Sequence, residues 1–284
     1  MPRSARHFYG TLSILLPGTS GMIRPLLPAA FAALLITTTA NAGDLVMAEA
    51  GELPVILTAP HGGIEDVPDC AVRTPTGSRF VNRPDQRTDL LARSIADEIR
   101  RLTGKTPYLV IARFHRKFID ANRRADEAYG APGCAAVYDA YHAAIRSSID
   151  EIRRRHPHAM LFDIHGQAAY PDAILRGTHY GAAVTRLLAR AGASSITGSD
   201  SVFGRFAAMG YRIVPLNDKA PTDRVEAAGY TGGYTVAIYG SNRDNGIDAM
   251  QLEFGRDLRT QDDIAKTARD TANAITVFYE RYLR

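Results

Sequence analysis

The sequence lacks several features that would assign it to a special class of protein. After residue 42 it has no apolar run of the roughly 20 residues that a membrane-spanning helix needs. It shows no internal repeat and no linker between domains. We therefore expect one domain over residues 43–284 and no stable insertion into a membrane.

An excess of charge is also absent once the N-terminus is set apart. The first 42 residues hold three of the 34 Lys and Arg and none of the 30 Asp and Glu, so residues 43–284 carry a net charge of +1. This balance provides neither the basic footprint of a nucleic-acid-binding protein nor a patch for a membrane surface. We expect no nucleic acid among the partners.

The N-terminal 42 residues have the pattern of a secretory signal peptide. Arg24 precedes an apolar run, Leu26–Ile36, which is followed by the small residues Ala40 and Ala42 around a predicted cleavage site. The stretch before Met22 is unusually long for such a peptide, so Met22 is an alternative start of the chain. The pattern predicts export, and the mature protein is expected to be periplasmic or secreted.

Cysteine is scarce, and both cysteines follow the predicted cleavage site. Cys70 and Cys134 lie in predicted loops or helix starts. An oxidising compartment would allow a disulfide between them. Two unpaired small residues are the alternative.

Short apolar runs alternate with amphipathic segments in residues 43–284, a length that suits one α/β domain. The predicted strands are at 55–57, 109–111 and 160–162, with further strands at 213–214, 235–239 and 250–254. Apolar residues at helical spacing predict helices at 91–102, 137–152 and 264–282. This alternation predicts a three-layer α/β/α domain with a mainly parallel sheet, in which ligands bind beyond the carboxyl ends of the strands.

Two histidines follow predicted strands, and glycine lies next to each. His61 comes after the first strand in Pro60-His61-Gly62-Gly63, and His165 after the third in Asp163-Ile164-His165-Gly166. Both are therefore expected at one rim of the sheet, where either alone would more often be a structural histidine. A catalytic zinc takes three ligands of His and carboxylate type, and other divalent ions accept the same ligands.

Two carboxylates are available as the third ligand, and the residues alone do not decide between them. Glu65 follows His61 by four residues, and Asp85 precedes the next predicted helix. A solvated loop charge is the simpler interpretation of Glu65. For Asp85 it is an acid favoured by the dipole at a helix N-terminus.

Two further segments contain candidate residues for substrate binding and for proton transfer. Asn122 and Arg123 come after the second predicted strand, and a guanidinium can hold a substrate carboxylate bidentately. An ordinary charged turn is the alternative. Glu253 interrupts the apolar run 250–254, where an unpaired buried charge is costly, so a role as general base is predicted. An edge strand with Glu253 facing solvent is the competing interpretation.

These segments occur in the order found in the N-formylglutamate amidohydrolase family, which the chain resembles from about Pro54 to Arg256. The segments are Pro60-His61-Gly62-Gly63, Asp85 before Thr88-Asp89-Leu90-Leu91, Asp120-Ala121-Asn122-Arg123, Asp163-Ile164-His165-Gly166, Gly177-Thr178 and Gln251-Leu252-Glu253. The family is similar to zinc carboxypeptidases, aspartoacylase-type deacylases and phage poly-γ-glutamate hydrolases. The resemblance implies a zinc carboxypeptidase-like fold with a mixed central sheet and one Zn²⁺ at its rim.

The resemblance also implies roles for individual residues. Zinc is expected on His61 and His165, the substrate carboxylate on Asn122 and Arg123, and the base at Glu253. In the carboxypeptidase pattern the acidic ligand follows the first histidine by three residues. This chain has Ile64 there, so the choice of third ligand stays open.

Two more residues match segments of the family. His142 follows Tyr141 in the second predicted helix, and Tyr234 follows Gly232-Gly233. Both are expected to contact substrate. The alternatives are a hydrogen-bonded helix histidine and a plain glycine turn.

The expected activity is therefore hydrolysis of the amide bond of an N-acyl amino acid such as N-formylglutamate, a small substrate that bears a carboxylate. Predicted export leaves a carboxypeptidase-like enzyme, or a hydrolase of poly-γ-glutamate or γ-glutamyl peptides, as an alternative. A non-catalytic binding protein on the same fold is an alternative of another class, because a fold does not determine a function.

Overall fold

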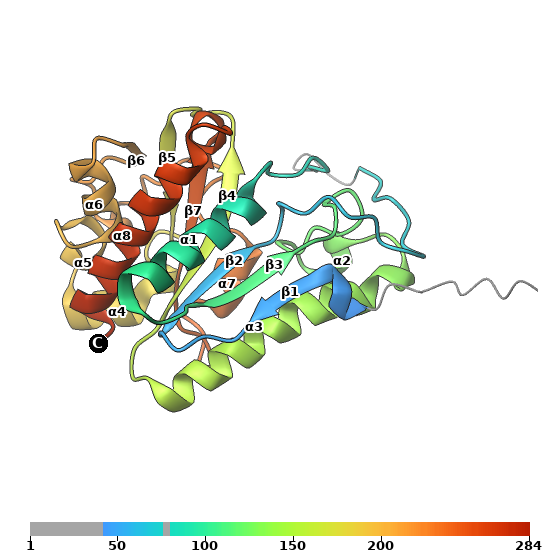
Figure 1. The fold of residues 1–284 in the computed structure, drawn as a ribbon, viewed down its shortest axis with the longest axis horizontal. Coiled ribbons are helices and arrows are strands. Elements are labelled where there is room, and N and C mark those ends of the chain that lie inside the picture. The colour runs from blue at the N-terminus through green and yellow to red at the C-terminus, as the bar shows by residue number, and fades with distance from the viewer. Residues whose placement is uncertain (1–41, 76–79) are drawn as a thin grey trace, which may run out of the picture. The chain divides into compact units, whose positions relative to one another are not determined.

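The computed structural model describes residues 42–75 and 80–284; Met22 and the rest of the predicted signal peptide, apart from its last residue, lie outside the described residues. The strands of this part form one sheet in the order β1-β3-β2-β4-β7-β5-β6 (Figure 1). Their bounds are β1 Val46–Glu49, β2 Val55–Ala59, β3 Tyr108–Ala112, β4 Met160–Gln167, β5 Ala173–Gly177, β6 Arg212–Val214 and β7 Asp248–Gly255. Strands β3, β2, β4 and β7 are parallel neighbours, whereas β1 and β5 run antiparallel to β3 and β7. The mainly parallel mixed sheet is confirmed.

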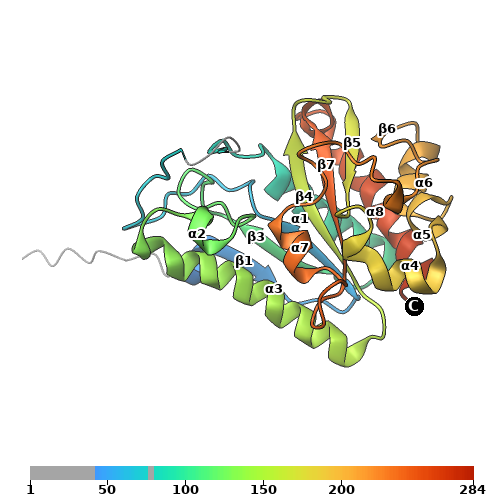
Figure 2. The same cartoon turned by 180° about the vertical axis from the view of Figure 1, so that it is seen from behind.

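Helices cover both faces of this sheet. The α-helices are α1 Thr88–Thr103, α2 Ala125–Ala128, α3 Ala135–Arg155, α4 Thr185–Ala191, α5 Ser194–Thr197, α6 Val202–Ala208, α7 Tyr234–Tyr239 and α8 Ile264–Tyr282. Short 3₁₀ segments are η1 Ala42–Leu45, η2 Pro132–Cys134, η3 Ala182–Val184, η4 Pro221–Asp223 and η5 Arg256–Arg259. One apolar cluster joins α1, α6 and α8 to the sheet (Figure 1), and a second joins α3 and α7 to the other face (Figure 2). The three layers are confirmed.

Three details of the predicted elements were wrong. The segment 235–239 is not a strand but forms helix α7, because an apolar run of five residues does not by itself distinguish the two. Leu102 does not continue the buried stripe of α1, since its side chain is 40% exposed. His165 lies inside β4 rather than after it, because the strand continues to Gln167.

The two cysteines form a disulfide. Cys70 lies in the loop between β2 and α1, and Cys134 ends η2 before α3. Their Cα atoms are 4.9 Å apart, and both side chains are buried. Of the two interpretations left open by the sequence, the disulfide is confirmed.

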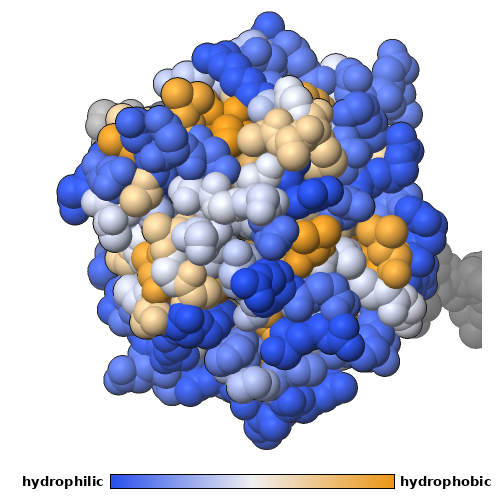
Figure 3. Space-filling model, turned by 90° about the vertical axis from the view of Figure 1, so that its left-hand side faces the viewer, coloured by the Kyte–Doolittle hydropathy of each residue, from blue (hydrophilic) through white to orange (hydrophobic). Residues whose placement is uncertain are grey.

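The surface is mostly hydrophilic where Figure 3 shows it, with scattered apolar side chains. None of the helices within residues 42–75 and 80–284 is long and apolar enough to cross a membrane.

Candidate active site

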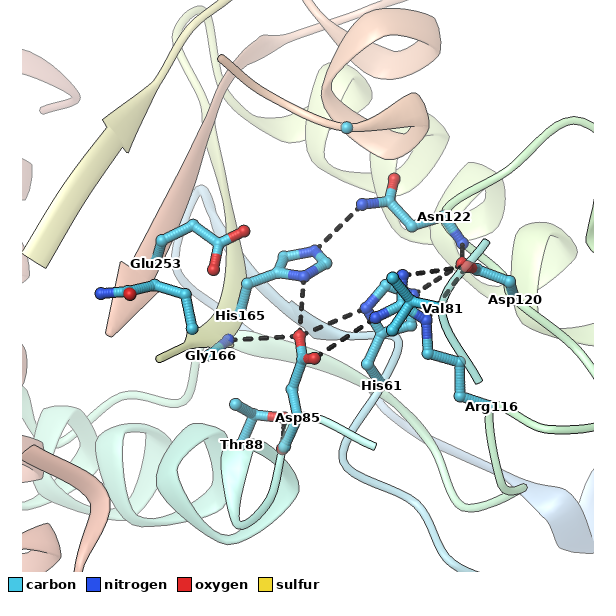
Figure 4. A network of polar contacts seen from close by, with 12 residues as sticks. His61, Val81, Asp85, Thr88, Arg116, Asp120, Asn122, His165, Gly166 and Glu253 are labelled. Atoms are coloured by element: carbon cyan, nitrogen blue, oxygen red, sulfur yellow. Dashed lines mark hydrogen bonds and ion pairs between the residues drawn. The ribbon is translucent and has the colours of Figure 1, made fainter. Parts of the chain in front are cut away.

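Adjacent parallel strands bring the two predicted histidines together. His61 follows β2, and His165 lies near the end of β4, the parallel neighbour of β2. Their ring centroids are 4.8 Å apart. Asp85 reaches them from the loop before α1, where its backbone N–H donates to the carbonyl of His61 at 2.9 Å. The candidate ligand atoms of His61, Asp85 and His165 all lie within 4.8 Å of one another (Figure 4).

The structure separates the two acids between which the sequence did not decide. Glu65 pairs with Arg113, with 2.7 Å between Oε1 and Nη2, and its side chain is 42% exposed. It is not part of the histidine cluster. Asp85 is at the helix start as predicted, but only its backbone carbonyl serves the helix by accepting from Oγ1 of Thr88. Its carboxylate turns to the histidines, so Asp85 is the acid that the geometry offers as third ligand.

Each histidine directs one ring nitrogen to Asp85 and the other to a second buried carboxylate. Nδ1 lies 3.3 Å from Oδ2 of Asp85 in His61 and 3.2 Å from the same atom in His165. Nε2 of His61 is 2.7 Å from Asp120, and Nε2 of His165 is 2.9 Å from Asp163. Histidines that bind metals usually donate their other ring N–H to such a partner, which fixes the ring. Two Nδ1 atoms and a carboxylate oxygen therefore fit a divalent transition ion such as zinc.

The roles of Asp120, Asp163 and Arg116 were missed from the sequence. Arg116 donates to Asp120 through Nε at 3.0 Å, and its Nη1 lies 3.3 Å from Oδ1 of Asp85. It thus links the third candidate ligand to the carboxylate that orients His61. The available signal was the presence of Asp120 and Asp163 in the same short segments as the predicted site residues.

The opposite charges of the histidines and the carboxylates shift the pKa values of Asp85 and His165. Burial opposes ionisation of Asp85, but the attraction of His61 and hydrogen bonds from both histidines outweigh it and hold the pKa of Asp85 well below its usual value. Burial likewise opposes protonation of His165, yet Asp163 and Asp85 hold its pKa well above the usual value. The cluster therefore favours positive charge at its centre, as a cation site requires.

Glu253 lies beside His165 across the strand pair β4–β7, where the two residues are register partners (Figure 4). Strand β7 is flanked by β4 and β5, so the interpretation of Glu253 as a solvent-facing edge residue was wrong. Its Oε1 accepts from Nε2 of Gln251 at 2.6 Å, whereas Oε2 has no hydrogen-bond partner among the described residues. Burial raises the pKa of Glu253 to about 7, although the charge of His165 opposes the shift.

Asn122 joins the site directly, and Arg123 lies next to it. Nδ2 of Asn122 is 3.2 Å from Nε2 of His165, and its Oδ1 accepts from the backbone N–H of Thr235 at 2.8 Å. Arg123 is partly exposed, and its Nη1 donates to the carbonyl of Asn122 at 3.3 Å. No ion pair of Arg123 occurs within the described parts of the chain. Its guanidinium thus keeps donors for an anion.

His142 and Tyr234 belong to one cluster of aromatic rings. Nδ1 of His142 is 2.9 Å from the hydroxyl of Tyr239, and its ring lies 4.4 Å from that of Tyr138 and 5.9 Å from that of Tyr234. The Tyr138 hydroxyl donates to the carbonyl of Arg123 at 2.8 Å. Burial lowers the pKa of His142 to about 4. His142 is hydrogen-bonded within its helix layer, and its contact with substrate stays a prediction.

Comparison with known proteins gives the chain its class. Residues 131–259 match the model of the family described as N-formylglutamate amidohydrolase, which confirms the resemblance seen in the sequence. The match includes His165 and Glu253, whereas His61 and Asp85 precede it. The match over this segment indicates an amidohydrolase enzyme. No curated protein sequence matches it at a significant level.

Two of the solved structures found share the fold at low sequence identity. An N-formylglutamate amidohydrolase from Ralstonia eutropha is similar with a TM-score of 0.57 and 16% identity, over 84% of this chain and 97% of that chain. A gene product of Agrobacterium tumefaciens gives 0.50 and 16%, over 83% and 95% of the two chains. A bacteriophage poly-γ-glutamate hydrolase is more distant, with a TM-score of 0.38 and 12% identity over 83% and 89%.

Proposed function

We propose that this protein is a zinc-dependent amidohydrolase that cleaves the amide bond of an N-acyl amino acid such as N-formylglutamate. One observation carries the proposal: His61, Asp85 and His165 converge beside Glu253, whose Oε2 is buried and unpartnered among the described residues. A binding protein without turnover has no use for a buried glutamate with a free oxygen, because such a group destabilises the fold.

The proposed metal ligands are Nδ1 of His61, Nδ1 of His165 and Oδ2 of Asp85. When bound, zinc would polarise the carbonyl oxygen of the substrate and lower the pKa of water towards neutrality. Asp120 and Asp163 keep both imidazole rings oriented through their Nε2 atoms. This orientation is present in the protein itself and does not have to be created on binding.

Glu253 is the proposed general base. A base works best when its pKa is near the operating pH, and burial raises the pKa of Glu253 to about 7. Gln251 holds Oε1 and leaves Oε2 to accept a proton from the attacking water. Glu253 would then return the proton to the leaving amine.

The proposed substrate carries a carboxylate, held by Arg123 with Asn122 beside it. The free donors of the Arg123 guanidinium support this assignment, since a guanidinium binds carboxylates in a bidentate geometry. Tyr234 and His142 complete the proposed substrate side of the site. The signal pattern of residues 1–42 supports an exported enzyme, and therefore also a second candidate substrate, a γ-glutamyl or peptide bond outside the cytoplasm.

Elemental analysis combined with a substrate panel tests the proposal. We expect about one zinc per chain, as a catalytic three-ligand site requires, and release of formate or amine from N-formylglutamate, N-acyl amino acids or γ-glutamyl peptides. A chelator should abolish hydrolysis, and added zinc should restore it. A His61→Ala/His165→Ala variant should bind no zinc. If the wild-type protein takes up no metal and cleaves none of these substrates, the proposed function is wrong.

A further inference from the structure

A buried arginine outside the proposed site donates hydrogen bonds to the backbone segments that carry the site residues. Arg259, in η5 after β7, is 6% exposed. Its guanidinium donates to three backbone carbonyls: those of Gln86, of Gln167 at 3.4 Å and of Phe254 at 3.2 Å. These carbonyls belong to three segments that are far apart in the sequence, so one side chain joins the loop before α1 to β4 and β7.

Each of the three carbonyls flanks a residue of the proposed site. They lie one residue after Asp85, two after His165 and one after Glu253. The guanidinium of Arg259 is thus hydrogen-bonded to all three backbone segments that carry two proposed metal ligands and the proposed base. Precise placement of such groups matters, because catalytic geometry tolerates displacements of only about 0.5 Å.

Gly166 shows how closely the guanidinium approaches this backbone. A Cβ atom added at Gly166 would come within 2.4 Å of Cζ of Arg259. The backbone N–H of Gly166 also donates to Oδ2 of Asp85 at 3.2 Å. A side chain directly after His165 would therefore displace the Arg259 guanidinium from its present position. The same residue, Gly166, contacts the candidate ligand oxygen.

The charge of Arg259 is not neutralised by an ion pair within residues 42–75 and 80–284. A buried cation without a counter-charge is costly, so it needs a compensating interaction. Burial lowers the pKa of Arg259, and the negative charges of Asp85 and then Glu253 oppose that shift. The carboxylates of the site therefore supply the electrostatic compensation at longer range.

We propose that Arg259 is a positioning residue that fixes the segments carrying Asp85, His165 and Glu253 relative to one another. The proposal rests on the proposed function, since it treats these residues as metal ligands and base. Arg259 acts only through backbone carbonyls and does not touch the reacting atoms. A change at Arg259 should consequently loosen the metal site even in a folded protein.

The test compares zinc affinity in the full chain, measured by competition with a chelator, for the wild type and four variants. Arg259→Met and Gly166→Ala should each weaken zinc binding about 10-fold or more, the usual effect of losing an outer-shell partner. The zinc affinity of Arg259→Lys should lie between those of the wild type and Arg259→Met, because an ammonium keeps the charge but lacks the planar arrangement of donors of a guanidinium. Arg256→Met is the matched control, since Arg256 lies in the same segment but is exposed and pairs with Asp257.

Circular dichroism of the zinc-free variants separates a positioning role from a structural one. If Arg259→Met melts earlier but the folded protein binds zinc as tightly as the wild type, the positioning role is wrong. If Arg259→Met does not fold, the zinc affinity of Gly166→Ala tests the positioning role instead. A wild type that binds zinc but cleaves no substrate contradicts only the proposed function. A wild type that binds no zinc overturns both proposals.

Discussion

Two buried glutamates in this protein have similar exposure and opposite surroundings. Glu226, in the loop after η4, accepts hydrogen bonds from both N–H and Oγ1 of Thr178 and from the N–H of Tyr180, and Arg176 lies 3.7 Å away. Glu253 has one oxygen bonded to Gln251 and one oxygen free among the described residues. Burial raises the pKa of both. Glu226 and the proposed base Glu253 are therefore alike in exposure and in the direction of their pKa shifts, and they differ in how many carboxylate oxygens are hydrogen-bonded.

Substitution of Glu253 should have the largest effect on function. Glu253→Gln keeps the shape but removes the proton acceptor, so hydrolysis should fall about 10²- to 10⁴-fold, the usual contribution of general base catalysis. The free energy of unfolding should not decrease, because the change removes a buried charge. Steady-state kinetics of the zinc-loaded protein and chemical denaturation measure the two effects. Full activity with zinc bound would show that Glu253 is not the base.

A buried histidine extends the comparison to a group that burial keeps neutral. The pKa of His142 is about 4 in the folded protein, against about 6.5 in an unfolded chain. Between these values the unfolded state binds more protons. The free energy of unfolding therefore has its full value with respect to His142 above pH 6.5. It decreases as the pH falls towards 4, by up to about 3 kcal/mol.

Denaturation at a series of pH values checks this sign. His142→Gln retains a partner for the hydroxyl of Tyr239 but does not titrate, so its unfolding free energy should change less between pH 6.5 and 4 than that of the wild type. Equal slopes for the two proteins in this range would mean that His142 is not held neutral by burial.

Glu226→Gln should show the converse of the result at Glu253. The amide places a donor opposite the N–H groups of Thr178 and Tyr180 and weakens charge-assisted hydrogen bonds, which should reduce the free energy of unfolding by about 2 kcal/mol. It should also remove the ion-pair partner of Arg176. Hydrolysis per folded molecule should fall far less than in Glu253→Gln. A variant that is as stable as the wild type but inactive would reverse the roles assigned to these glutamates.

The sequence predicted the elements that rest on local patterns. Strands β2, β3, β4 and β7 are continuous apolar runs, and α1, α3 and α8 carry apolar stripes at helical spacing. Strand β1 escaped prediction because it is a half-exposed edge strand. Strand β5 escaped it because it contains Arg176, whose burial depends on Glu226 some 50 positions later.

The site residues were likewise predictable from the sequence where they lie in short local segments. His61, His165 and Glu253 follow from short segments beside predicted strands, and the structure brings them together. The choice of Asp85 required the path of the loop between β2 and α1, and tertiary contacts alone reveal Asp120 as the partner of His61. Arg259 has no local signal for this role, because two of its three acceptors, the carbonyls of Gln86 and Gln167, come from distant segments.

The smallest effect is expected at the acid that the structure excludes from the cluster. Glu65→Gln removes an exposed ion pair with Arg113, which is worth about 0–1 kcal/mol, so stability should change little. Zinc content should also remain at about one ion per chain, the content of a catalytic site. In Asp85→Asn, by contrast, zinc should be lost, since Oδ2 of Asp85 lies 3.3 Å from Nδ1 of His61 and 3.2 Å from Nδ1 of His165. Elemental analysis of the two variants side by side decides between the acids, and loss of zinc from Glu65→Gln alone would return Glu65 to the ligand set.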